Sequence, residues 1–80
     1  MKYELFKEIV LLTDIPEKKL KKGDVATIVE YHRSESSEDG YSLEVFNALG
    51  DSIAVVTLPE SEIGPLRKNE IFNVRLLETA

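Results

Sequence analysis

Short runs of β-branched and aromatic residues recur along this chain at intervals of about ten residues, with turn-forming residues between them. Runs of this length are typical of β-strands, and no long amphipathic pattern of helical period accompanies them. Short strands at regular spacing are typical of β-sandwiches and β-barrels. Because 80 residues suffice for only one compact core, the sequence predicts a single all-β domain over residues 1–80, and this length favours a small barrel.

The middle of the chain predicts a β-hairpin. Residues 41–46 alternate between the two faces of a strand, residues 47–51 carry turn-forming types, and residues 52–58 are a second apolar run. Before them, residues 25–31 give the strongest strand signal, because five of the seven are β-branched or aromatic. We expect these side chains to point inward: Val25, Thr27, Val29, Leu43, Val45, Ile53 and Val55.

Residues 8–13 form a short apolar run that Asp14 and Pro16 end, because proline disfavours helical geometry at the residue before it. This run predicts a buried strand. A helix over residues 2–12 is the alternative, since five apolar side chains there also fit one helical face. They are Leu5, Phe6, Ile9, Val10 and Leu12. No good N-cap residue precedes them, which favours the strand.

Two polar segments predict loops. Residues 14–23 are polar apart from Ile15 and Leu20, and they end at Gly23, a residue that can adopt the positive φ of a turn. Residues 33–40 contain no apolar side chain and are rich in Ser, Glu and Asp, which predicts a flexible, exposed loop.

The last quarter of the chain predicts a turn and two strands. Residues 59–62 begin with proline and predict a 3₁₀ turn. Residues 63–66 are long enough only for a short strand, and the glycine and proline within them place it at a sheet edge. Residues 71–77 alternate again, so that the C-terminal extension, residues 67–80, is expected to hold a last strand.

The order of these predicted elements is that of an SH3-like barrel. A first strand, a long loop, a central strand, a second loop, a hairpin, a 3₁₀ turn and a short edge strand follow one another. We therefore expect a small SH3-like barrel of five to six antiparallel strands, with an OB-like barrel as the main alternative.

The net charge of −5 hides a strong asymmetry along the chain. Residues 1–33 hold seven basic and six acidic residues, residues 34–66 hold seven acidic and no basic ones, and residues 67–80 hold three basic and two acidic ones. An acidic surface can attract a basic partner protein, and a tyrosine at its border can bury its ring while its hydroxyl stays in water. The predicted partner-binding residues are Tyr31, Glu35, Glu38, Asp39 and Tyr41.

Four lysines lie within five residues, directly before Gly23. Lysines are common in solvated loops, but Lys18, Lys19, Lys21 and Lys22 could also contact an anion, nucleic acid or the ribosome. The acidic remainder of the chain opposes a broad attraction to nucleic acid, which makes this the alternative function.

The sequence holds few groups for catalysis. It has no cysteine and only one histidine, His32, which excludes thiol chemistry, disulfides and a zinc site of soft ligands. Isolated glycines form no phosphate-binding loop, and the serine- and acid-rich segment lacks the ligand spacing of a calcium loop. We predict neither an enzyme nor a bound metal or cofactor. Since no apolar run reaches the roughly 18 residues of a membrane span and no signal-peptide layout opens the chain, a cytoplasmic location is expected.

The sequence also resembles a family of small uncharacterised bacterial proteins, frequent in cyanobacteria, that forms a domain of unknown function. The resemblance spans about residues 4–66 and is most specific at Asp14-Ile15-Pro16-Glu17 and Leu20-Lys21-Lys22-Gly23-Asp24. It implies an SH3-like barrel and an association with small toxin-like proteins, as an antidote would have. The chain departs from the family pattern at Ala26, where glycine is common, and in residues 67–80, which could add a strand or a homodimer contact through an edge strand.

Overall fold

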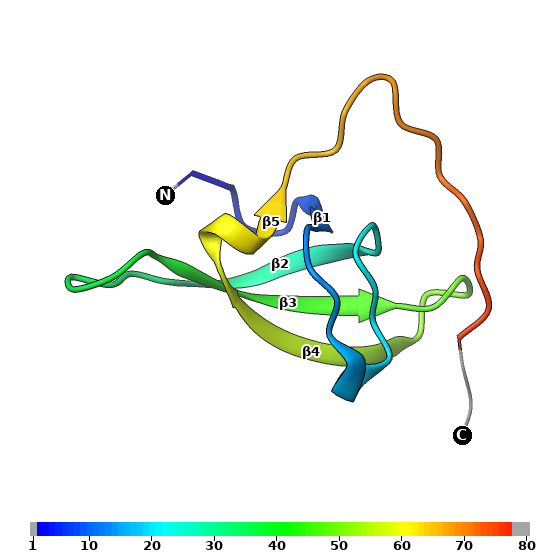
Figure 1. Cartoon of the computed structure of the whole chain (residues 1–80), viewed down its shortest axis with the longest axis horizontal. Helices are drawn as coiled ribbons and strands as arrows, with labels where there is room; N and C mark the ends of the chain where they lie inside the picture. The colour runs from blue at the N-terminus through cyan, green and yellow to red at the C-terminus, as the bar shows by residue number, and fades with distance from the viewer. Residues whose placement is uncertain (1, 78–80) are drawn as a thin grey trace.

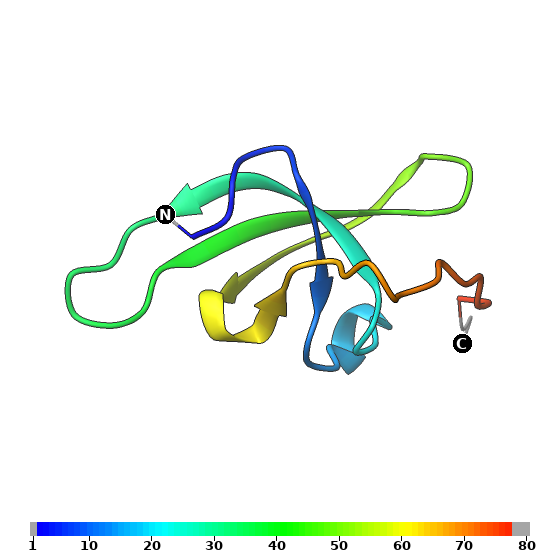
Figure 2. The ribbon, with the colours of Figure 1, turned by 90° about the horizontal axis from the view of Figure 1, so that it is seen from above.

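The computed structural model describes residues 2–77, which form one antiparallel sheet of five strands. In chain order the elements are β1 (Glu8–Leu11), the 3₁₀ helix η1 (Pro16–Lys18), β2 (Val25–His32), β3 (Gly40–Phe46), β4 (Ser52–Pro59), the 3₁₀ helix η2 (Glu60–Glu62) and β5 (Ile63–Gly64) (Figure 1). The strand order across the sheet is β4-β3-β2-β1-β5. Figure 2 shows β1 crossing over the long strands, so that the sheet curls into a small SH3-like barrel, as expected.

The N-terminal apolar run is a strand, and the helical alternative is wrong. β1 pairs with β2 on one side, where Ile9 lies opposite Ala26, and with β5 on the other, where Leu11 lies opposite Ile63. A central place in a sheet covers both sides of its backbone, which explains why an apolar run of only four residues is stable as a strand. β5 has two residues and lies at the sheet edge, as predicted.

One apolar core holds the curled sheet together. In β3 the predicted inward face is confirmed, because Tyr41, Leu43 and Val45 are all buried. The loop between β1 and β2 adds Leu20, which is 2% exposed and is fixed by a β-bridge between Ile15 and Leu20. The buried apolar residues are Ile9, Leu11, Leu20, Ala26, Ile28, Tyr41, Leu43, Val45, Val56 and Ile63.

The inward faces of β2 and β4 are the reverse of those predicted. In β2 the core takes up Ala26 and Ile28 instead of Val25, Thr27 and Val29.

The pairing with β3 gives the reason. Directly opposite residues of neighbouring strands share a face, and Leu43 lies opposite both Ile28 and Val56. The inward Leu43 therefore brings Val56 inward and turns Ile53 and Val55 out, with exposed fractions of 40% and 54%.

The predicted last strand over residues 71–77 is wrong. This segment, which we call the tail, contains no strand and runs past the end of the β3–β4 hairpin (Figure 1). Its apolar side chains are in water, with Ile71 91% and Leu76 89% exposed. Residues 78–80 of the predicted extension lie outside the described residues. A strand needs a neighbour for its backbone groups, and the tail has none in residues 2–77. No described helix has the length and apolar character to cross a membrane.

Candidate functional site

Four acidic side chains gather where the loop between β2 and β3 meets η2. The Glu60 amide donates to the Asp39 carbonyl oxygen at 2.8 Å. The amide and hydroxyl of Ser61 donate to the two carboxylate oxygens of Glu38 at 2.7 and 3.0 Å. We call Glu35, Glu38, Asp39 and Glu60 the acidic end, which includes three of the predicted partner-binding residues. The loop was predicted to be flexible, but these bonds attach it to a segment more than twenty residues away in the chain.

Asp39 also closes the loop from inside. Its Oδ2 accepts a hydrogen bond from the Tyr31 hydroxyl at 2.5 Å, and its Oδ1 accepts one from the Ser34 amide at 3.0 Å. Hydrogen bonds to a carboxylate favour its charged form, so they lower the pKa of Asp39. The same bond to Asp39 raises the pKa of Tyr31 to about 12. The charge of the acidic end is therefore fixed by geometry over a wide pH range.

We expect Tyr31→Phe to weaken the dependence of stability on acid. The folded-state pKa of Asp39 is lowered, so its contribution is present above the unfolded value and is lost as pH falls through the folded one. Without the Tyr31 hydroxyl, the folded and unfolded pKa values of Asp39 move closer together. Melting temperatures measured between pH 7 and about pH 2.5 should therefore fall less steeply for Tyr31→Phe than for the wild type. Equal slopes would show that the Tyr31–Asp39 bond does not set the pKa of Asp39.

Tyr41 supports the acidic end from behind rather than contacting its surface. Its side chain is fully buried, and its hydroxyl donates to Glu60 Oε2 at 2.7 Å while accepting from the amides of Lys2 and Tyr3 at 3.1 and 3.2 Å. Its ring packs between Tyr3 and Tyr31, with centroid distances of 5.7 and 5.4 Å. Burial, and then the bond to Glu60, raises the pKa of Tyr41, so the hydroxyl stays protonated at neutral pH. Tyr31 is half-buried, and Glu35 is exposed.

A short polar chain crosses the sheet beside this end. His32 Nε2 lies 2.7 Å from Ser42 Oγ, which lies 3.0 Å from Thr57 Oγ1. A carboxylate oxygen of Glu30 is 3.7 Å from the same histidine nitrogen. In a catalytic triad the acid binds the opposite ring nitrogen and orients the histidine toward the nucleophile. Here both contacts fall on Nε2, and Ser42 is only 8% exposed, so this arrangement suits a buried strand contact better than catalysis.

The four lysines lie on a loop that aspartates hold in shape. Asp14 accepts from the Lys22 amide and Asp24 accepts from the Lys21 amide, each at 2.8 Å. The lysine side chains are exposed, and Lys19 has a positive φ of 60° at the end of η1. This loop therefore combines its cations with carboxylates, which reduces its local positive field.

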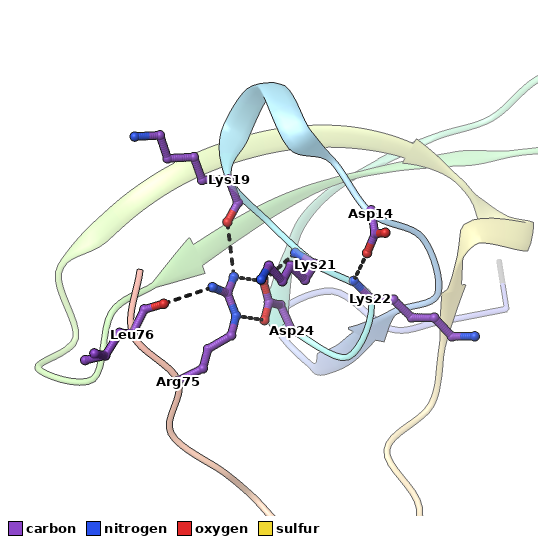
Figure 3. A network of polar contacts seen from close by, with 7 residues as sticks. All are labelled: Asp14, Lys19, Lys21, Lys22, Asp24, Arg75 and Leu76. Atoms are coloured by element: carbon purple, nitrogen blue, oxygen red, sulfur yellow. Dashed lines mark hydrogen bonds and ion pairs between the residues drawn. The ribbon is translucent and has the colours of Figure 1, made fainter. Parts of the chain in front are cut away.

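The tail reaches this loop through Arg75 (Figure 3). The Arg75 guanidinium binds both carboxylate oxygens of Asp24, at 2.9 and 2.6 Å, and donates to the Lys19 carbonyl oxygen at 3.1 Å. Burial raises the pKa of Asp24, but the bonds from Arg75 and the Lys21 amide outweigh it, so the pKa is lowered overall.

The sequence did not indicate Glu60, Ser61 or Arg75 as members of these contacts. Arg75 and Asp24 are 51 residues apart, and Ser61 and Glu38 are 23 apart. Charge alone could have suggested these partners, but many other pairs fit it equally well. In the part of the chain that the structure describes, no three His, Cys, Asp or Glu side chains are grouped as a metal site requires.

Comparison with known proteins places the folded part of the chain in a family. No curated protein and no solved structure matches it. The sequence model of a family described as a domain of unknown function, DUF4926, matches residues 5–65. The matched region runs from just before β1 to just after β5 and leaves the tail outside it. By this match the chain belongs to the DUF4926 family.

Proposed function

We propose that this protein is a non-enzymatic interaction module that binds a basic partner protein through its acidic end. The observation that carries the proposal is that the acidic loop is held in one shape by bonds to η2 and to Tyr31. A preorganised loop loses little conformational entropy on binding, which leaves more of the interaction energy for affinity.

The charge distribution also supports a basic partner. Residues 34–66 include seven acidic residues and no lysine or arginine, and they supply all four members of the acidic end. Among residues 2–77, no lysine or arginine side chain forms an ion pair with these four carboxylates. A field of one sign speeds the encounter with a partner of opposite sign and weakens as salt is added.

The shape of the surface favours protein binding over a small-molecule reaction. The polar groups of the acidic end lie on a loop and a 3₁₀ turn, not in an enclosed apolar pocket of the kind that shifts catalytic pKa values. A small toxin-like protein that this module neutralises is our candidate for the basic partner, and we place both in the cytoplasm. Binding through the lysine loop to nucleic acid or the ribosome is the competing function.

We expect Glu35→Lys with Glu38→Lys to weaken capture of the basic partner by about tenfold or more, because attraction becomes repulsion at the centre of the contact. Both side chains are exposed, so the melting temperature should change little. The measurement is a tagged pull-down from native lysate at physiological salt, with mass spectrometry of the retained proteins.

Two controls separate charge from structure. Ser61→Ala removes both bonds to Glu38 but keeps the carboxylates, so capture should be retained. Glu8→Lys with Glu17→Lys makes the same change in net charge on other exposed positions and should also retain capture. Equal capture by the wild type and the Glu35 and Glu38 variant would contradict the proposal. Retention of nuclease-sensitive material would instead favour the lysine loop.

A further inference from the structure

The outer edge of β4 lacks the usual protection of an edge strand. β4 ends the sheet, is eight residues long and carries no charged side chain. Between described residues, no backbone hydrogen bond outside the β3 pairing involves residues 52–58. Proteins usually shorten such edges or place charges, proline or bulges on them, because free backbone groups and apolar side chains invite another strand. The opposite edge, β5, has only two residues and is followed directly by Pro65.

A groove of about 460 Å³ runs beside this free edge. Residues 55–58 of β4 form one wall, and residues 13–15, Glu17 and Lys18 contribute to the other. Its charged lining residues are three acids and one lysine, namely Asp14, Glu17, Glu62 and Lys18. The groove therefore combines strand backbone, apolar surface and a net negative charge, which suits an extended segment with apolar side chains and one cation.

The tail has these properties. Residues 71–77 alternate with the period of a strand, and Arg75 is their only charged residue. Seven residues match the length of the eight-residue β4 edge. Phe72 and Val74 are 75% and 81% exposed in a single copy, so the tail leaves its apolar side chains in water. A strand-forming segment without a neighbour and an edge strand without a neighbour thus occur in one chain.

We propose that two copies of this protein exchange their tails, with residues 71–77 of each copy adding as a strand to the β4 edge of the other. Within one copy, Arg75 holds the tail at Lys19 and Asp24, and these residues do not line the groove. A tail that leaves this anchor can pair with β4 of a second copy, where its backbone gains a ladder and Arg75 meets the groove carboxylates. The exchange is reciprocal, so it closes as a two-fold dimer and leaves neither β4 edge free. The inference is independent of the proposed function.

The test is the mass of the full chain in solution, measured by light scattering and sedimentation over a range of concentrations. We expect twice the 9.0 kDa of one copy. Val55→Lys on the edge and Phe72→Asp in the tail change exposed positions and should each raise the dimer dissociation constant at least tenfold. Leu49→Lys, at an 89% exposed apolar residue in the β3–β4 turn, is the matched control and should leave the dimer intact.

A mixture of the two variants makes the test specific for exchange. Val55→Lys keeps an intact tail and Phe72→Asp keeps an intact edge, so equal amounts should form a heterodimer although each variant alone is monomeric. Asp24→Asn, which loosens the Arg75 anchor, should tighten the dimer. A monomer at all concentrations, a dimer that survives both variants, or a monomer whose residues 71–77 are protected from hydrogen exchange would each overturn the proposal.

Discussion

We expect Ile28→Ala to lower the free energy of unfolding by about 2–5 kcal/mol, whereas Val29→Ala should cost less than about 1.5 kcal/mol. Ile28 is fully buried opposite Leu43. Val29 is the neighbour that the sequence placed inward, but in the structure it is only partly buried. The larger loss comes from the transfer energy of the removed methylene and methyl groups together with the cavity that they leave. Since a domain of this size has a total stability of roughly 4–12 kcal/mol, Ile28→Ala should bring it close to unfolding.

Urea denaturation followed by circular dichroism would measure both variants. The slope of the unfolding free energy against urea should stay equal to that of the wild type, which would show that only stability has changed. A second pair, Val56→Ala and Val55→Ala, tests β4 in the same way, because Val56 is 9% and Val55 is 54% exposed. Equal losses within a pair, or a larger loss for Val29 or Val55, would mean that the strands face the other way.

These pairs also show what the sequence could predict about the fold. Strand positions, the hairpin, the 3₁₀ turn after Pro59 and the short edge strand depend on local patterns and were predicted correctly. The inward faces of β2 and β4 were not, because a run that is apolar at nearly every position has no alternation to indicate a face. They depend instead on pairing with β3, where alternation was present and the inward face was predicted correctly.

The candidate site was predictable as a composition but not as a structure. The absence of cations from residues 34–66 is visible in the sequence and indicates an acidic surface. Nothing in it shows that Glu38 binds Ser61 or that Asp39 binds Tyr31, because these contacts arise only when β2, β3 and η2 come together. The tail makes the same point in reverse. Its alternation is a correct local signal for a strand, but a strand also requires a neighbour.

We expect Tyr41→Phe to lower the free energy of unfolding by about 1–3 kcal/mol, although it removes a single oxygen. The Tyr41 hydroxyl donates to Glu60 and accepts from the amides of Lys2 and Tyr3, so its loss affects three groups at once. The ring stays in place between Tyr3 and Tyr31, which separates the effect of the hydroxyl from that of packing. Tyr41→Leu, which also removes the ring, should cost more.

The consequence for binding follows from the position of Glu60. Tyr41 anchors the Glu60 carboxylate, while the Glu60 amide binds the Asp39 carbonyl, so η2 connects the buried tyrosine to the acidic loop. Hydrogen exchange of the Glu60 and Ser61 amides should therefore be faster in Tyr41→Phe, and partner capture should weaken without any change in charge. If the variant is less stable but captures the partner as well as the wild type does, the acidic carboxylates attract the partner without needing a fixed loop. Preorganisation would then play no part in binding, and only the electrostatic half of the proposed function would stand.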